Sequence, residues 1–141
     1  MIDSQVIFKP EEQFFTKKSL HFGSRIVISP DRFIYLTIGD RGDDKRAQDP
    51  FDYAGSIIRI ELDGSVPRDN PYSDGMKAFP EIWSIGHRNP QGAFWNPLTN
   101  TLWTVSHGAM GGDEINIARP GRNYGWPIIS YGRHYSGKSA T

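Results

Sequence analysis

The sequence predicts an all-β fold assembled from blades of a β-propeller, and three observations support this prediction. The 141 residues include 15 Gly, 10 Pro, 8 Phe, 6 Tyr and 4 Trp, a composition typical of short strands joined by tight turns. Apolar segments occur in pairs around a turn that contains proline. The pair recurs along the chain, with Pro97 following Pro30 by 67 residues. Repeated antiparallel strands with polar residues at equivalent ends are typical of propeller blades, so we predict two to three blades.

The predicted elements follow the chain in order. Residues 1–20 form a poorly defined N-terminal segment, in which residues 2–8 could form a strand, and residues 21–141 hold the propeller part. Each strand is a run of β-branched and aromatic residues bounded by turn formers. A charged loop without apolar periodicity occupies residues 41–50, and the tail after Tyr131 carries no pattern. The predicted strands are residues 25–29, 33–38, 56–62, 82–85, 93–95, 101–106 and 114–118.

The charge balance argues against several classes of partner. Lys plus Arg and Asp plus Glu number 16 each, so no net field attracts nucleic acid or an anionic membrane. No apolar run approaches the roughly 18 residues of a membrane span. The first residues lack the basic and then apolar pattern of a signal peptide. We therefore expect no nucleic-acid partner, no membrane span and no signal peptide in this chain.

One turn is richer in chemistry than a chain reversal requires. It reads Gly86-His87-Arg88-Asn89-Pro90-Gln91-Gly92 between two apolar segments. A reversal needs Gly, Pro, Asn or Asp, because these residues supply positive φ, a fixed φ or a local hydrogen bond. It does not need an imidazole and a guanidinium as well. We interpret this turn as part of a site for an anionic or carbonyl-rich ligand.

Further polar residues stand at predicted strand ends, where propeller geometry would gather them around one cavity. His21 precedes the first strand, Asp40 follows the second, and His107-Gly108 follows a later strand. Each has an ordinary interpretation as well. His21 could be a surface or core histidine, Asp40 could cap a turn, and Asp113-Glu114 could be solvated charge.

Five blocks of sequence, in order between about residue 20 and residue 137, resemble the soluble quinoprotein glucose/aldose sugar dehydrogenases of the glucose/sorbosone dehydrogenase type. Together they are more specific than any one of them. The blocks are His21-Phe-Gly-Ser-Arg25 with Ile-Gly-Asp40, residues 57–71, the turn 86–92, Gly111-Gly-Asp-Glu-Ile-Asn116, and Asn123-Tyr-Gly-Trp-Pro127.

The resemblance implies a six-bladed propeller and an oxidoreductase. Members of that family oxidise the anomeric carbon of aldose sugars, passing a hydride from C1 to pyrroloquinoline quinone (PQQ) with calcium present. An electron acceptor then reoxidises the cofactor. By resemblance, His21 is the general base for the C1 hydroxyl proton, a role that suits an imidazole held by a carboxylate.

The resemblance also assigns roles to other site residues. Asp40 and Asp113 would orient the imidazole, and Arg88 would stabilise charge on the quinone oxygens. Arg88, Asn89 and His107 would bind the cofactor, and the backbone carbonyls of Gly108 and Ala109 would bind calcium. Glu114 and Tyr124 match positions that help to bind a second, structural calcium ion.

The chain departs from the family pattern in two ways. Position 109 is Ala where the family often has Pro, and His107 stands where some members have Gln. The match also begins partway into the family pattern and ends before its last blades. We therefore expect this chain to be part of a larger, periplasmic or secreted protein. Its exposed blade edges would permit self-association. The alternative function is a calcium-stabilised propeller module that binds a sugar or a partner without redox chemistry.

Overall fold

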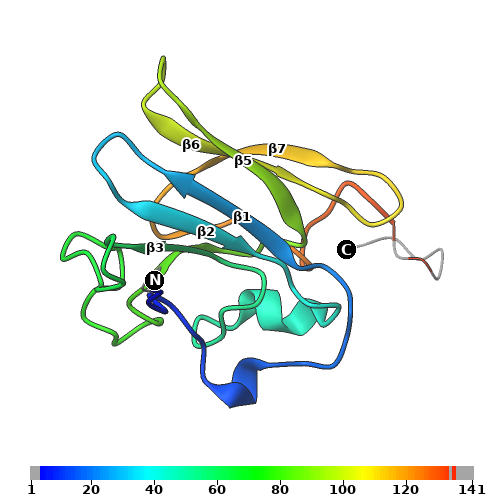
Figure 1. The fold of residues 1–141 in the computed structure, drawn as a ribbon. Coiled ribbons are helices and arrows are strands. Elements are labelled where there is room, and N and C mark those ends of the chain that lie inside the picture. The colour runs from blue at the N-terminus through cyan, green and yellow to red at the C-terminus, as the bar shows by residue number, and fades with distance from the viewer. Residues whose placement is uncertain (1–3, 134, 136–141) are drawn as a thin grey trace.

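Two β-sheets make up the fold (Figure 1). The computed structural model describes residues 4–133 and residue 135. One sheet has the strand order β1-β2-β3-β4-β8 and the other the order β5-β6-β7. The strands are β1 Gly23–Ile28, β2 Ile34–Ile38, β3 Ile57–Ile60, β4 Ile82–Ile85, β5 Pro90–Asn96, β6 Thr101–Ser106, β7 Glu114–Ala118 and β8 Arg122–Asn123. Two short 3-10 helices are η1 Glu12–Phe14 and η2 Asp44–Gln48. The all-β prediction is confirmed.

The predicted strands are present, although β1 begins two residues earlier than predicted, at Gly23, and β3 is shorter, ending at Ile60. Strand β5 begins at Pro90, inside the polar turn, and β8 was not predicted. Residues 4–8 of the strand considered near the N-terminus are not extended into a sheet. The charged loop holds η2, because a short polar stretch can satisfy its backbone through i to i+3 hydrogen bonds without an apolar face. Within the described residues, no helix is long and apolar enough to cross a membrane.

The two sheets repeat one another. Strands β1 and β2 form an antiparallel hairpin, as do β5 and β6, and the second hairpin follows the first at the 67-residue offset seen in the sequence. The tips of both hairpins lie at the same end of the molecule (Figure 1). Residues that precede β1 and β5 or follow β2 and β6 therefore meet at the opposite end. That end holds the candidate site.

The core lies between the two sheets. Tyr35 and Ile57 of the first sheet are buried against Leu102 and Ala118 of the second. Alternation along each strand directs these side chains to the shared interface. Fully burying one such apolar side chain contributes roughly 1.5–3 kcal/mol. The interface therefore fixes how the two sheets sit on one another.

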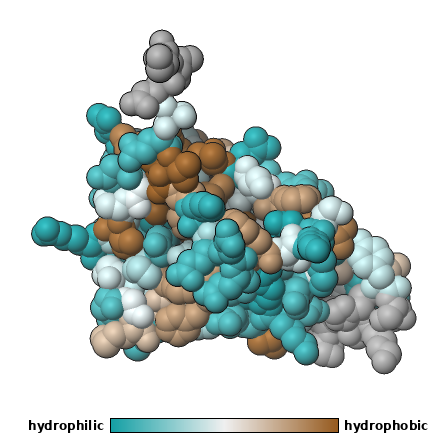
Figure 2. Space-filling view, turned by 60° about the horizontal axis from the view of Figure 1, so that its bottom comes forward, coloured by the Kyte–Doolittle hydropathy of each residue, from teal (hydrophilic) through white to brown (hydrophobic). Residues whose placement is uncertain are grey.

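The outer faces of both sheets carry exposed apolar side chains. Ile26 of β1 is 63% exposed, and Phe94, Val105 and Ile115 of the second sheet are exposed as well. The face of the molecule shown in Figure 2 also carries apolar patches, which polar residues separate. Exposed apolar side chains gathered on one face often mark a contact with further protein. Both faces are therefore suited to receive neighbouring structure.

Candidate active site

A cavity of about 440 Å³ opens at the end of the sheets where the two repeats converge. His21 enters it from just before β1, Asp40 from just after β2 and Arg88 from just before β5. The rest of the wall is formed by Leu20, Gly42, Asp43, Asp44, Ala109, Trp126 and Tyr135. The fold thus brings together three of the residues that the sequence selected as catalytic, although they are far apart along the chain.

A carboxylate and an imidazole form the centre of this cavity. Nδ1 of His21 lies 2.6 Å from Oδ1 of Asp40, whose side chain is only 1% exposed. The same carboxylate accepts hydrogen bonds from the indole Nε1 of Trp126 at 2.8 Å and from the backbone N–H of Gly42 at 2.8 Å. Because an ionised carboxylate only accepts, the proton of a neutral His21 sits on Nδ1. Nε2 of His21 is then left with a lone pair.

The backbone of His21 is held closely against Gly39. His21 has a φ of 47°, in the left-handed region that non-glycine residues seldom adopt. A Cβ atom added at Gly39 would collide with the carbonyl group of His21. Glycine at position 39 therefore allows the imidazole to reach the Asp40 carboxylate next to it.

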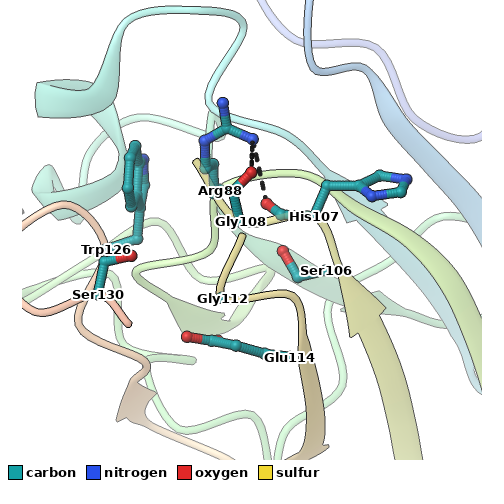
Figure 3. A pocket seen from close by; sticks show the side chains of 8 residues that line it. All are labelled: Arg88, Ser106, His107, Gly108, Gly112, Glu114, Trp126 and Ser130. Atoms are coloured by element: carbon teal, nitrogen blue, oxygen red, sulfur yellow. Dashed lines mark hydrogen bonds between the residues drawn. The ribbon is translucent and has the colours of Figure 1, made fainter. Parts of the chain in front are cut away.

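Arg88 is a buried cation without a carboxylate partner. Its side chain is anchored by hydrogen bonds from Nη1 to the carbonyl oxygens of His107 at 3.2 Å and Gly108 at 2.8 Å (Figure 3). Its Nε atom has no hydrogen-bond partner in the described part of the chain, and none of the ion pairs found there includes Arg88. A buried charge is costly unless it is paired. The cavity therefore suits a ligand that brings negative charge or carbonyl oxygens to Arg88.

Asn89 joins the polar turn to both sheets. Its side-chain Oδ1 accepts a hydrogen bond from the backbone N–H of Gly23 at 3.1 Å. Its own backbone N–H donates to Oγ of Ser106 at 3.2 Å. The sequence predicts Asn89 as a cofactor ligand. These contacts show it holding β1 beside β5, and they leave its amide nitrogen without a partner among the described residues.

His87 points away from the cavity. Its imidazole is buried, with Nε2 2.9 Å from Oγ of Ser84, and stacks on the ring of Tyr124 at a centroid distance of 4.6 Å. Burial lowers the pKa of His87 to about 3. The sequence suggested that the imidazole of this turn belongs with the ligand site, and that interpretation is wrong for His87. The buried imidazole of His87 instead stabilises the turn through its contacts with Ser84 and Tyr124.

Asp113 and His107 form a separate pair beside the Arg88 anchor. Asp113 accepts a hydrogen bond from the backbone N–H of Gly108 at 2.9 Å, and this bond lowers the pKa of its carboxyl group. Its other oxygen lies 3.5 Å from Nδ1 of His107, whose Nε2 contacts Oε1 of Gln91 at 3.1 Å. Asp113 was expected, together with Asp40, to orient His21. In the described residues Asp40 contacts the imidazole, whereas Asp113 contacts the loop after β6.

The carbonyls predicted to bind calcium have other partners here. The Gly108 carbonyl accepts from the Arg88 guanidinium, and the Ala109 carbonyl accepts from the backbone N–H of Arg133 at 2.7 Å. The positive charge of a guanidinium 2.8 Å from the Gly108 oxygen would repel a second cation bound to the same oxygen. This arrangement therefore does not fit a calcium ion at Gly108.

The residues assigned to a second calcium ion are also engaged. Oε2 of Glu114 accepts a hydrogen bond from the Asn116 amide at 3.0 Å, and the Tyr124 hydroxyl donates to the carbonyl of Ile117 at 2.5 Å. Within the described residues, no group of three or more His, Asp or Glu side chains is placed to hold a metal ion. The calcium assignment stays a prediction from the resemblance.

Trp126 is the site residue that sequence reasoning missed. It donates to Asp40, and its ring lies 5.2 Å from the guanidinium carbon of Arg88. The available signal was an aromatic residue between Gly125 and Pro127, in a loop otherwise rich in turn formers. That signal does not show which carboxylate the indole would reach.

One family model matches the chain over its full length. The family described as Glucose / Sorbosone dehydrogenase matches residues 1–141. The chain belongs to this family. The aldose sugar dehydrogenase of Escherichia coli (strain K12) is 44% identical over 117 residues, covering 83% of this chain and 32% of that protein. The chain spans 35%, 32% and 26% of the length of the first three curated relatives that it matches.

Solved structures agree with this assignment. A crystal structure of a glucose dehydrogenase has a TM-score of 0.90 at 38% identity, covering 96% of this chain and 38% of that one. The PQQ-bound form of an aldose sugar dehydrogenase from Streptomyces coelicolor has a TM-score of 0.72 at 34% identity, with coverages of 85% and 34%. These identities support the family as well as the fold.

Proposed function

We propose that this chain supplies the general-base part of an active site that oxidises the C1 hydroxyl of aldose sugars, with PQQ as the bound oxidant. One observation carries the proposal. The His21 and Asp40 pair and the unpaired guanidinium of Arg88 line the same cavity of about 440 Å³. A base and a cation on one cavity suit a reaction that removes a proton while negative charge develops nearby.

PQQ fits the residues that are present. It carries carboxylates and quinone carbonyls, and Arg88 offers a buried guanidinium whose Nε has no hydrogen-bond partner in the described part of the chain. The flat ring of Trp126 beside that guanidinium suits a planar partner. When bound, PQQ would supply a two-electron acceptor. Arg88 and the free amide nitrogen of Asn89 would hold and orient it.

The chain's own contribution to chemistry is the proton transfer. Nε2 of His21 would accept the proton of the sugar C1 hydroxyl, because Asp40 keeps the other ring nitrogen protonated. Trp126 and the Gly42 backbone fix the carboxylate, so the imidazole cannot rotate without losing its partner. Asp40 would also stabilise the imidazolium that forms. Calcium has no part in this proposed proton transfer, because the Gly108 carbonyl already accepts a hydrogen bond from the Arg88 guanidinium.

Several features of the whole protein are part of the same proposal. Residues 21–141 would form part of a larger propeller, with further blades against the exposed faces that include Ile26 and Ile115. An electron acceptor would reoxidise the cofactor, and the parent protein would act in the periplasm or outside the cell. If those faces are left open, they would drive self-association.

The test is turnover by the purified protein. It is mixed with PQQ, with or without calcium, and offered aldoses and an artificial electron acceptor whose reduction changes its colour. His21→Ala should lower the rate by about 10²–10⁴-fold in protein that remains folded at the assay temperature, with a lower unfolding temperature because the buried Asp40 loses one hydrogen-bond donor. Asp74→Asn, in an exposed loop, is the matched control and should keep full activity. Absence of both turnover and saturable PQQ binding would refute the proposal.

A further inference from the structure

A second cleft, of about 290 Å³, lies at the opposite end of the sheets from the candidate active site. It is lined at the start of β2, the end of β3, the start of β4 and the end of β5. The candidate site is lined at the other ends of these strands. Residues of both sheets line the cleft.

Aromatic rings form the apolar wall of this cleft. Tyr35 stands between two half-buried tryptophans, with its ring centroid 5.4 Å from that of Trp83 and 5.6 Å from that of Trp95. The indole N–H groups are already used, since Trp83 donates to the carbonyl of Ala118 and Trp95 donates to Oδ1 of Asn100. These bonds hold the rings in place and leave carbon surface facing the cleft.

The polar groups of the cleft balance in charge. Two carboxylates, Asp31 and Asp69, line it together with two guanidinium groups, Arg59 and Arg119. Arg59 and Asp69 already form a two-pronged ion pair with N to O distances of 3.0 and 3.2 Å. The cleft as a whole therefore carries no net charge, so it does not select an anion or a cation over a neutral ligand.

One hydroxyl in the cleft is left open. The Tyr35 hydroxyl has no hydrogen-bond partner among the described residues, and it is not sealed from the cleft. Burial raises the pKa of Tyr35 to about 12, so the group stays protonated and can donate as well as accept. A purely apolar ligand would leave this hydroxyl unsatisfied, at a cost that polar ligands avoid.

We propose that this cleft is a second, non-catalytic site for an uncharged carbohydrate. The C–H face of a pyranose ring would pack on Trp95, and a sugar hydroxyl would pair with Tyr35. Carboxylate and amide groups at the rim of the cleft would form hydrogen bonds with the other hydroxyls of the sugar. The volume, at the lower end of the range for ligand pockets, suits a single sugar ring. This site goes beyond the proposed dehydrogenase activity and does not depend on it.

The experiment uses sugars that cannot be oxidised at C1. Methyl α-D-glucoside and methyl β-D-glucoside each have one pyranose ring and no free anomeric hydroxyl, so they are not substrates for the proposed reaction. Each is titrated into the protein while tryptophan fluorescence and heat of binding are followed. We expect saturable binding that Tyr35→Phe weakens about 5-fold through the loss of one hydrogen bond. Because the Tyr35 hydroxyl bonds to no described residue, this variant should fold normally.

Two tryptophans provide a matched pair of variants. Trp95 faces the cleft, whereas Trp103 on the neighbouring strand lies on the opposite face of the sheet beside Phe94. Both indoles donate to the β5–β6 turn region. Trp95→Ala should weaken binding about 10-fold, and Trp103→Ala should leave it unchanged.

Three results would overturn this inference. They are absence of saturable binding, binding that Tyr35→Phe does not weaken, and binding lost in His21→Ala but retained in the cleft variants. The last result would place the sugar in the candidate active site. Failure of PQQ-dependent turnover would not affect the inference, because the titrations use neither cofactor nor substrate.

Discussion

The buried imidazole of His87 should make the protein lose stability in mild acid. Replacing His87 by Gln removes the titrating group and keeps a side chain that can pair with Ser84, its partner at 2.9 Å. The pKa of His87 falls from 6.5 to about 3 on burial, so protonation favours the unfolded chain. The stabilisation is therefore complete above pH 6.5 and is lost progressively as the pH falls toward 3.

The size of the effect follows from the two pKa values. Each pH unit below 6.5 and above 3 costs about 1.4 kcal/mol in the free energy of unfolding, because the unfolded state binds one more proton. Between about pH 7.5 and about pH 5 this amounts to roughly 2 kcal/mol. In His87→Gln this contribution should be absent at every pH.

Urea unfolding, followed by tryptophan fluorescence across that pH range, measures the difference. Carboxylates also contribute to acid destabilisation, so the quantity of interest is wild type minus variant, which cancels them. If wild type and His87→Gln lose stability in parallel as the pH falls, the burial argument is refuted.

The remaining predictions concern the candidate base. In Asp40→Asn, one carboxylate oxygen becomes an amide nitrogen, which cannot accept a hydrogen bond. Either Nδ1 of His21 or Nε1 of Trp126 therefore loses its acceptor. We expect unfolding to become easier by about 2–3 kcal/mol in urea titration, and turnover to fall about 10²–10⁴-fold. Activity close to wild type would show that Asp40 does not set the tautomer. Gly39→Ala should displace the His21 backbone and lower both stability, by about 1–3 kcal/mol, and turnover, while Gly75→Ala in open space should spare turnover. Equal activity of these two variants would contradict the inference that the close contact between Gly39 and the His21 backbone positions the imidazole.

Local sequence pattern was sufficient for most of the fold. Strands β4, β6 and β7 begin and end where the apolar runs meet turn formers, because these two signals agree there. Strand β8 has two polar residues and owes its existence to parallel pairing of Arg122 with Ser84, a tertiary contact that no local pattern reports. The start of β5 at Pro90 was missed for a related reason, since the polar turn runs directly into the strand.

The candidate site shows a similar division. Strand ends that face one axis could be read from the repeat, so His21, Asp40 and Arg88 were expected around one cavity and are found there. Direct contacts depend on loop conformation. The indole of Trp126 reaches Asp40 only because the loop after β8 folds back, and Asp113 instead turns toward Gly108. Residue type identifies candidates for chemistry, and packing decides which of them meet.

Three consecutive residues of the polar turn have three different placements. His87 enters the interior against Tyr124, Arg88 faces the cavity, and Asn89 binds the start of β1. A ligand site needs a cation that is fixed before the ligand arrives, because ordering it later costs binding energy. The buried imidazole and the Asn89 contact supply that order from both sides of Arg88. Protonation of His87 would therefore disturb the position of Arg88 as well as the stability of the fold.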